Sequence, residues 1–321
     1  MERDIRKILS NFKTTGEIVD YRKIVTGHIN DSYYIKTTST EHSGYFLQWV
    51  NNYIFKNVDG LMNNIATVTH HLAEKLASHP ELSFKVLEIV PTTDHDRFYY
   101  ETEGEYWRLY KFIDNAHSYD VVENTKIAYE GGKAFGLFMS LLADLPANRL
   151  LETIPDFHNM EKRLDTFNRS LAGNPAHRAA LIPAEIEFVK NRAGQMLTIP
   201  ALVREGKLPM RITHNDTKFN NILFDSTNHA MCKALAVIYL DTVMPGSVLF
   251  DFGDAIRTGA NTAAEDEKDL TKVDINLPIY EAYTQGFLKS TRNSLNEVQV
   301  ENLAFSARFM TFTIGLPSLT A

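Results

Sequence analysis

The chain is nearly free of cysteine. Cys232 is the only one among 321 residues. No disulfide can form within the chain, and a metal site built from cysteines would lack its ligands. We therefore expect a protein of the reducing cytoplasm.

Clusters of basic residues are also missing. Thirty-three Lys and Arg stand against 40 Asp and Glu, which gives a net charge of −7 and a pI of about 5.9. Nucleic acids and anionic lipid surfaces attract concentrated positive charge. The sequence therefore predicts no nucleic-acid partner and no membrane partner, and it does not indicate an oligomeric state.

Long apolar runs are absent. The first residues, MERDIRKILSNFK, alternate charges with single apolar side chains, and no later run approaches the length of a membrane span. We expect neither an export signal nor a membrane span. A composition of 44% hydrophobic and 23% charged residues is instead typical of a globular protein with a sizeable core.

The first third of the chain has the pattern of an antiparallel sheet with one helix. Short β-branched and aromatic clusters over residues 18–49 predict strands, with a tight connection at Thr26 to Asp31. Apolar residues three and four apart predict a helix over Asn57 to Ser78. Alternation over residues 83–101 and 105–113, with a turn around Thr92 to Asp96, predicts two further strands that close this lobe near Phe112.

The rest of the chain has mainly helical spacing. Two strand-like runs interrupt it, NILFD and ALAVIYLD, joined by a turn-rich segment that predicts a hairpin. We therefore predict an α+β, protein-kinase-like fold of two lobes. Residues 1–110 would form a small antiparallel β-rich N-lobe that covers a nucleotide, and residues 111–321 a larger, mainly helical C-lobe with the catalytic loop, metal site and acceptor pocket.

The stretch HNDTKFNNILFD (His214 to Asp225) has the spacing H-x-D-x-x-x-x-N, with Asp216 and Asn221 at the two key positions. In phosphotransferase catalytic loops the Asp accepts the proton of the acceptor hydroxyl and the Asn binds Mg²⁺. The spacing also fits an Asx-rich turn ahead of a strand. Asp241, at the end of the second strand-like run, favours the phosphotransferase reading because a hairpin would bring it to the end that holds Asn221.

A second Asp motif lies further along. Asp251-Phe252-Gly253 spells the DFG tripeptide of protein kinases, but it follows a turn instead of a strand. We therefore assign the metal to Asn221 and Asp241, and interpret Asp251 and Asp254 as supporting carboxylates.

The nucleotide contacts of the first lobe are less distinctive. The segment Gly27 to Ser32, with His28 and Asn30, is the best candidate for a phosphate-covering loop, although a plain hairpin turn fits it as well. The strand YFLQWV has Gln48 or Trp49 where a kinase would offer a lysine for the phosphates. Which residue replaces that lysine is left open.

Several longer stretches carry a family resemblance over most of the chain. They are GHINDSY, NIATVTHHL, ADLPANRLLETIPDFHNMEKRLDTF, THNDTKFNNILFD and LDTVMPGSVLFDFGDAIRTGANTAAEDEKDL. In these the sequence resembles the aminoglycoside phosphotransferase and choline kinase superfamily, and within it the N-acetylhexosamine 1-kinases.

The resemblance implies an ATP- and Mg²⁺-dependent kinase of a small molecule. Asp216 would be the catalytic base, and Asn221 and Asp241 the metal ligands. The segment Arg108 to Ile113, including Tyr110, would give backbone hydrogen bonds to adenine. The acceptor would be the anomeric hydroxyl of N-acetylglucosamine or N-acetylgalactosamine, and the product a sugar 1-phosphate.

The chain departs from the subfamily pattern near residue 317. Pro317 stands where the pattern has an Arg that could bind sugar hydroxyls, and the pattern continues beyond Ala321. Two alternatives therefore stay open. One is a kinase for choline, homoserine or an aminoglycoside, with the carboxylates of Glu265 to Asp269, Asp251 and Asp254 as a cation-binding pocket. The other is a nucleotide- or sugar-binding module without turnover.

Overall fold

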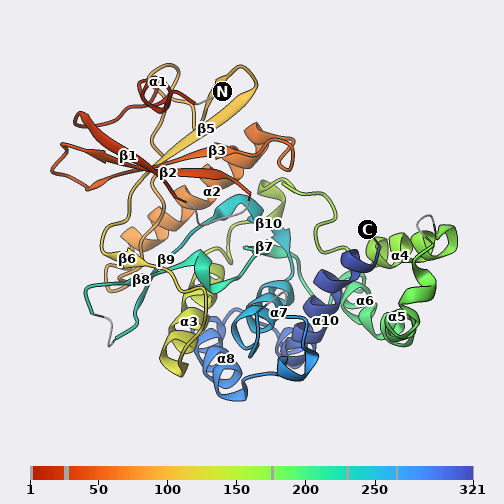
Figure 1. Cartoon of the computed structure of the whole chain (residues 1–321). Coiled ribbons are helices and arrows are strands. Elements are labelled where there is room, and N and C mark those ends of the chain that lie inside the picture. Colours follow the sequence, from red (N-terminus) through yellow and green to blue (C-terminus); the bar gives the residue numbers. More distant parts are fainter. Residues whose placement is uncertain (1–2, 25–28, 175–176, 229–230, 265–266, 321) are drawn as a thin grey trace. The chain divides into compact units, whose positions relative to one another are not determined.

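The computed structural model describes residues 3–24, 29–174, 177–228, 231–264 and 267–320 (Figure 1). Its contacts divide the chain into two compact units. Unit 1 comprises residues 1–119, 148–154 and 220–244, and unit 2 comprises 120–147, 155–219 and 245–321. The sequence placed one boundary at residue 110, whereas the structure also assigns the 220–244 segment to the first unit.

Unit 1 contains a five-stranded sheet with the order β1-β2-β3-β5-β4, in which every neighbouring pair is antiparallel. This confirms the predicted antiparallel arrangement. The strands are β1 (Ile18–Ile24), β2 (Asp31–Thr37), β3 (Gly44–Val50), β4 (Tyr100–Thr102) and β5 (Glu105–Lys111).

The strand predicted from residue 83 onward is wrong in its first half. Residues 83–99 form no continuous strand: they have isolated bridges of Ile89 with Tyr110 and of Thr92 with Phe12, and the Lys85 N–H donates to the Leu235 carbonyl oxygen of β9 (Ala234–Val237) at 2.6 Å. Pro91 lies two residues after Ile89 and has no N–H that could extend the pairing with β5. The apolar residues of this segment are therefore paired with β5 only briefly.

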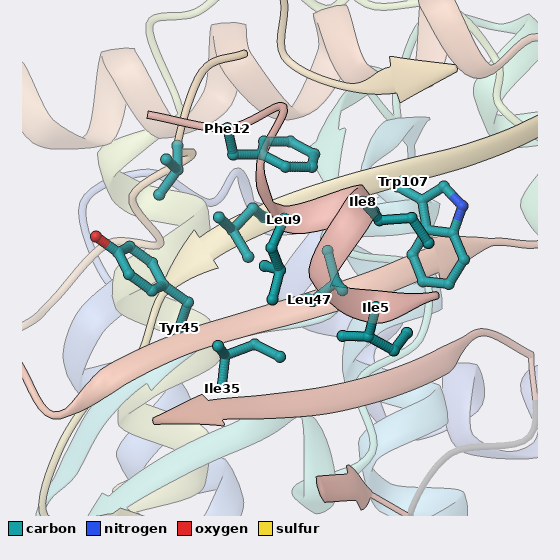
Figure 2. Close-up of a cluster of buried hydrophobic side chains, with 10 residues drawn as sticks. Ile5, Ile8, Leu9, Phe12, Ile35, Tyr45, Leu47 and Trp107 are labelled. Atoms are coloured by element: carbon teal, nitrogen blue, oxygen red, sulfur yellow. The ribbon is translucent and has the colours of Figure 1, made fainter. Parts of the chain in front are cut away.

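The short helix α1 (Ile5–Leu9) covers one side of the sheet. Its Ile5, Ile8 and Leu9 are buried with Leu47 of β3 and Trp107 of β5 (Figure 2). Asp4 caps the helix by accepting a hydrogen bond from the Lys7 N–H. Burial of these apolar side chains fixes β3 against β5, the two strands that carry the site residues described below.

The predicted helix of unit 1 is α2 (Val58–Ala77). Asn57 caps it by accepting a hydrogen bond from the Gly60 N–H. Of the face predicted from the spacing, Leu61, Ile65, Val68 and Leu72 are buried, and Leu76 in the last turn is half-buried.

A second, three-stranded sheet in unit 1 has the order β6-β8-β9, formed by β6 (Ala116–His117), β8 (Ile222–Asp225) and β9 (Ala234–Val237). The β8–β9 pair confirms the predicted hairpin. Because β6 pairs with β8, the hairpin belongs to unit 1 although it lies far along the sequence.

Unit 2 is mainly helical, as predicted. Its α-helices are α3 (Thr125–Leu141), α4 (Met160–Gly173), α5 (Pro183–Met196), α6 (Thr198–Arg204), α7 (Val248–Gly259), α8 (Leu277–Thr291), α9 (Glu297–Glu301) and α10 (Leu303–Gly315). The strand β7 (Arg211–Thr213) pairs with β10 (Met244–Gly246). Within the described ranges, no helix combines the length and the apolar character needed to span a bilayer.

Glycines let two helices of unit 2 approach closely. A Cβ at Gly132 of α3 would lie 2.1 Å from the Tyr283 carbonyl oxygen, and one at Gly286 of α8 would lie 2.0 Å from that of Tyr129. A larger side chain at either position would force the backbones of α3 and α8 apart.

Candidate functional site

The catalytic loop of unit 2 follows β7 directly. Asn215 has a φ of 63°, in the left-handed region that Asn tolerates better than most residues. The Asp216 N–H donates to His214 Nδ1 at 3.3 Å. This sharp turn places Asp216 in a partly exposed position between fully buried neighbours, His214 and Thr217.

Two carboxylates of α7 accept hydrogen bonds from the backbone of the loop. Asp251 accepts the backbone N–H groups of His214 and Asn215 at 2.8 and 2.7 Å. Asp254 accepts the Thr217 N–H at 3.1 Å. Both carboxylates accept backbone N–H groups of the loop, which agrees with their interpretation as supporting carboxylates.

Burial perturbs both carboxylates. Desolvation raises the pKa of Asp251 to about 7, and nearby Asp254 and Asp216 act in the same direction, whereas the two backbone donors lower it. Desolvation also raises the pKa of Asp254, against the lowering effect of Arg257, whose guanidinium donates to Asp254 at 2.9 Å. Burial therefore disfavours the charged form of both carboxylates.

His158 is a loop contact that the sequence did not reveal. Its Nε2 donates to the Asn215 carbonyl oxygen at 3.1 Å, and its ring packs against Phe157 and Phe250. Burial lowers the pKa of His158 to about 4, so the imidazole is neutral near neutral pH. No spacing signal links this histidine to a loop 57 residues later.

The two predicted metal ligands lie at one end of the β8–β9 hairpin in unit 1. Asn221 ends a 3₁₀ turn (Phe219–Asn221), and its carbonyl oxygen accepts the Ile238 N–H at 2.9 Å. Asp241 lies in a second 3₁₀ turn (Leu240–Thr242) that follows β9. The pairing of Ile222 with Val237 thus sets both ligands beside the same end of the ladder. Their roles stay predictions.

The Asp241 carboxylate accepts hydrogen bonds from Arg108 of the five-stranded sheet and from Asn30, which precedes β2. Arg108 of β5 donates to Oδ1 at 2.6 Å and to Oδ2 at 2.9 Å, and Asn30 donates to Oδ2 at 3.4 Å. Gln48 of β3 accepts from Arg108 Nε and Nη2 at 3.1 and 2.9 Å. Arg108 and Gln48 are 1% and 2% exposed, so this is a buried polar network.

Unit 1 also contains a cavity of about 220 Å³ next to this network. Its wall is largely apolar and includes Phe46, Phe112, Leu223 and Ile238. Gln48, Arg108 and Tyr110 provide the polar part. A flat aromatic ring with a charged substituent matches this distribution of apolar and polar surface.

Of the residues predicted to bind the nucleotide, two lie outside the part of the chain that the structure describes. Gly27 and His28 lie outside the described residues. Asn30 is described, and its Oδ1 also accepts the Asn51 N–H at 3.0 Å. Tyr110 lines the cavity, and burial raises its pKa to about 12.

Arg108 differs from its predicted setting. Instead of belonging to a connecting segment with free backbone groups, it lies inside β5 opposite Gln48 of β3. Sheet pairing continues to Lys111, so the connecting segment begins only at Phe112. Arg108 itself is one of the residues that line the cavity.

The proposed ligands suit Mg²⁺. Asn221 offers an amide oxygen and Asp241 a carboxylate, and Mg²⁺ in kinases is held by one or two such groups together with substrate phosphates and water. Within the described ranges no group of three His, Cys, Asp or Glu side chains is placed to hold a metal ion.

Unit 2 contains a larger cavity of about 680 Å³. Its charged lining residues are Arg192, Arg257, Arg308 and Asp274, among apolar neighbours that include Phe188 and Phe312. Arg257 connects the cavity to the catalytic loop because it pairs with Asp254, which binds Thr217. The lining thus carries three cationic side chains and one carboxylate.

Comparisons with known proteins agree with this layout. A model of the phosphotransferase enzyme family (APH) matches residues 20–283. A spectinomycin phosphotransferase, solved with ADP and spectinomycin, matches 98% of this chain and 87% of its own with a TM-score of 0.55 and 12% identity.

Two further solved structures have the same fold. The amicoumacin kinase hAmiN, solved with AMP-PNP, Ca²⁺ and Ami, is 12% identical over 98% of this chain and 85% of its own, with a TM-score of 0.60. A choline kinase from Cryptosporidium parvum Iowa II is 12% identical over 94% and 83%, with a TM-score of 0.56. The predicted kinase-like fold, with an antiparallel N-lobe sheet and a helical C-lobe, is therefore confirmed.

Proposed function

We propose that this chain, which belongs to the phosphotransferase enzyme family, is an ATP- and Mg²⁺-dependent kinase that phosphorylates a hydroxyl group of a small molecule. The observation that carries the proposal is the fixed catalytic loop. Asp251, Asp254 and His158 bind its backbone on both sides of Asp216. These hydrogen bonds hold the loop backbone in one conformation and thereby restrict the orientation of the Asp216 carboxylate, as a general base requires.

The roles follow from the chemistry of phosphoryl transfer. Such a reaction needs in-line positioning of the acceptor and neutralisation of phosphate charge more than covalent help from the protein. Asp216 accepts the proton of the acceptor hydroxyl. Asn221 and Asp241 hold Mg²⁺, which supplies charge neutralisation at the phosphates when it is bound.

The nucleotide belongs to the cavity of unit 1. Phe46, Phe112 and Ile238 line it with apolar surface suited to an adenine ring, and Phe112 and Ile113, which follow β5, are also lining residues. Relatives solved with ADP and AMP-PNP support this choice of ligand.

For the acceptor we propose an N-acetylhexosamine, phosphorylated at its anomeric hydroxyl. The subfamily motifs favour it, and the unit 2 cavity is lined by the N–H-bearing side chains of Arg192, Arg308 and Asn261, which suit carbonyl and hydroxyl oxygens. The same lining argues against choline or an aminoglycoside. Arg257 is paired with Asp254, which leaves Arg192 and Arg308 against the single Asp274 of the lining, and this balance disfavours a cationic acceptor.

The carboxylates considered for a cation-binding pocket are also engaged elsewhere. Asp251 is fully buried on backbone donors, and Asp254 is shared between Thr217 and Arg257. Glu265 and Asp266 lie outside the described residues. A neutral sugar is therefore the better match to the described cavity.

An acceptor panel tests this proposal. ADP release from Mg²⁺-ATP is measured with N-acetylglucosamine, N-acetylgalactosamine, glucose, galactose, choline, homoserine and kanamycin. We expect kcat/KM for the N-acetylated sugars to exceed that for glucose and galactose by about tenfold or more, since one well-placed group is worth that much in a fitted pocket. The phosphorus-31 spectrum of the product should show coupling to the anomeric proton.

Other outcomes separate the alternatives. Turnover only with choline, homoserine or kanamycin would contradict the sugar and keep the kinase. Thermal stabilisation by ATP with no ADP from any acceptor would support a binding module without turnover.

A further inference from the structure

Strand β3 lacks the cation that pairs with nucleotide phosphates in kinases. Gln48 stands at that level of the sheet, and its partner in the antiparallel ladder with β5 is Arg108. The two side chains are hydrogen-bonded and both line the unit 1 cavity. A cation is thus present at the expected level, but it comes from the neighbouring strand.

Arg108 is charged under all working conditions. Burial alone would lower its pKa, but the Asp241 carboxylate more than compensates, and the net effect raises the pKa above its ordinary value. The other cation on this cavity wall, Lys111, is exposed and pairs with Glu88 at 2.6 Å. Among the described lining residues, Arg108 is therefore the buried positive charge.

Two neighbours fix the guanidinium in one plane. Gln48 Oε1 accepts two of its N–H groups, and Gln48 Nε2 in turn donates to Ser32 Oγ of β2 at 3.0 Å. Two further N–H groups form a fork on the Asp241 carboxylate. This planar, two-pronged donor geometry suits a phosphate as well as a carboxylate.

We propose that Arg108 is the phosphate-binding cation of this nucleotide site and that Asp241 is its partner while no nucleotide is bound. When Mg²⁺-nucleotide enters, Arg108 exchanges the carboxylate for phosphate oxygens and Asp241 exchanges the guanidinium for the metal ion. Gln48 is a positioning residue that keeps the guanidinium at the cavity wall. This inference rests on the proposed function.

The exchange is favourable because no buried charge loses a partner. Removing one member of a buried ion pair is strongly destabilising, since the other charge is left uncompensated. Mg²⁺ and phosphate arrive together and replace both partners at once. In contrast, an Arg108–Asp241 ion pair that only stabilised the fold would not need to line the cavity, and it would not need the hydrogen bonds from Arg108 to Gln48.

Binding of ADP and adenosine, measured by calorimetry in saturating Mg²⁺ without an acceptor, tests Arg108 without turnover. For the unaltered chain we expect ADP to bind at least about tenfold more tightly than adenosine, because hydrogen bonds to charged groups contribute that much. Arg108→Met should abolish most of this preference while adenosine affinity stays within about twofold, since Met leaves the apolar wall intact. Arg108→Lys should keep part of it.

A paired swap guards against simple misfolding. Gln48→Lys combined with Arg108→Gln moves the positive charge to the opposite residue of the same ladder pair. The swap should restore a preference for ADP over adenosine of about tenfold. Gln48→Leu, which removes only the hold on the guanidinium, should weaken ADP binding and leave adenosine binding unchanged.

Two results would overturn the inference in different ways. If the affinity for ADP relative to adenosine is the same in Arg108→Met as in the unaltered chain, the ion pair is purely structural. Where Arg108→Met does not fold, the same ratio in Arg108→Lys and in the paired swap would lead to that conclusion. If the unaltered chain binds neither ADP nor ATP, the proposed function itself fails, and the inference falls with it.

Discussion

Replacing Asp216 with alanine is expected to lower kcat by about 10²–10⁴-fold, the contribution typical of a positioned general base. Nucleotide affinity should be unchanged, because this carboxylate acts on the acceptor hydroxyl. The loop backbone should also keep its geometry, since Asp251, Asp254 and His158 bind the residues around Asp216. Acceptor-dependent ADP release and calorimetric ATP binding measure the two effects separately.

Asp216→Asn is the closer comparison, because it keeps the shape of the side chain and removes its basicity. Asp165→Ala serves as the control, since this exposed carboxylate on α4 pairs only with Arg169 of the same helix. Asp216→Ala with undiminished turnover would contradict the assignment of the base. An equal loss of ATP affinity would move Asp216 from the acceptor to the nucleotide.

Replacing Asp251 with alanine is expected to destabilise the protein and to abolish turnover. Two buried backbone N–H groups, those of His214 and Asn215, would lose their acceptor. An unsatisfied buried donor costs about 1–3 kcal/mol, so the free energy of unfolding should fall by roughly 2–6 kcal/mol. Denaturant unfolding measures the loss, and a variant of undiminished stability would contradict the supporting role.

The same carboxyl predicts a pH dependence of stability. Its pKa is about 7 in the folded chain against an ordinary value of 3.8, so between these values the folded state binds more protons than the unfolded state. The contribution of Asp251 to stability is therefore fully present below about pH 4 and is lost as the pH rises through 7. The Asn side chain of Asp251→Asn cannot titrate. The free energy of unfolding of this variant, measured by denaturant unfolding, should therefore rise relative to that of the unaltered chain as the pH rises from about 4 to about 7.

Local patterns in the sequence were sufficient for the main elements. The alternation of residues 18–49 specified three strands of one sheet, and Leu61, Ile65 and Leu72 specified the buried face of α2. The spacing from Asp216 to Asn221 located the loop because the chemistry itself imposes that spacing. Asp241 followed from the geometry of a hairpin.

Contacts between distant residues were beyond this reasoning. Arg108 and Asp241 are 133 residues apart, and nothing in either local sequence indicates that β5 presents a guanidinium to the end of the β8–β9 hairpin. His158 reaches the loop through a connecting segment without periodicity. Residues 83–90 alternate like a strand, but Pro91 and the limited edge of β5 leave most of them unpaired.

We propose that phosphoryl transfer by this chain depends on a metal held by Asn221 and Asp241. The most direct test is a Mg²⁺ titration of acceptor-stimulated ADP release, starting from EDTA, with the unaltered chain, Asn221→Ala and Asp241→Ala. We expect no ADP in EDTA, a saturable rise with Mg²⁺ in the unaltered chain, and a shift of both variants to higher Mg²⁺. ADP formation in EDTA, or the same Mg²⁺ dependence in all three proteins, would contradict the account.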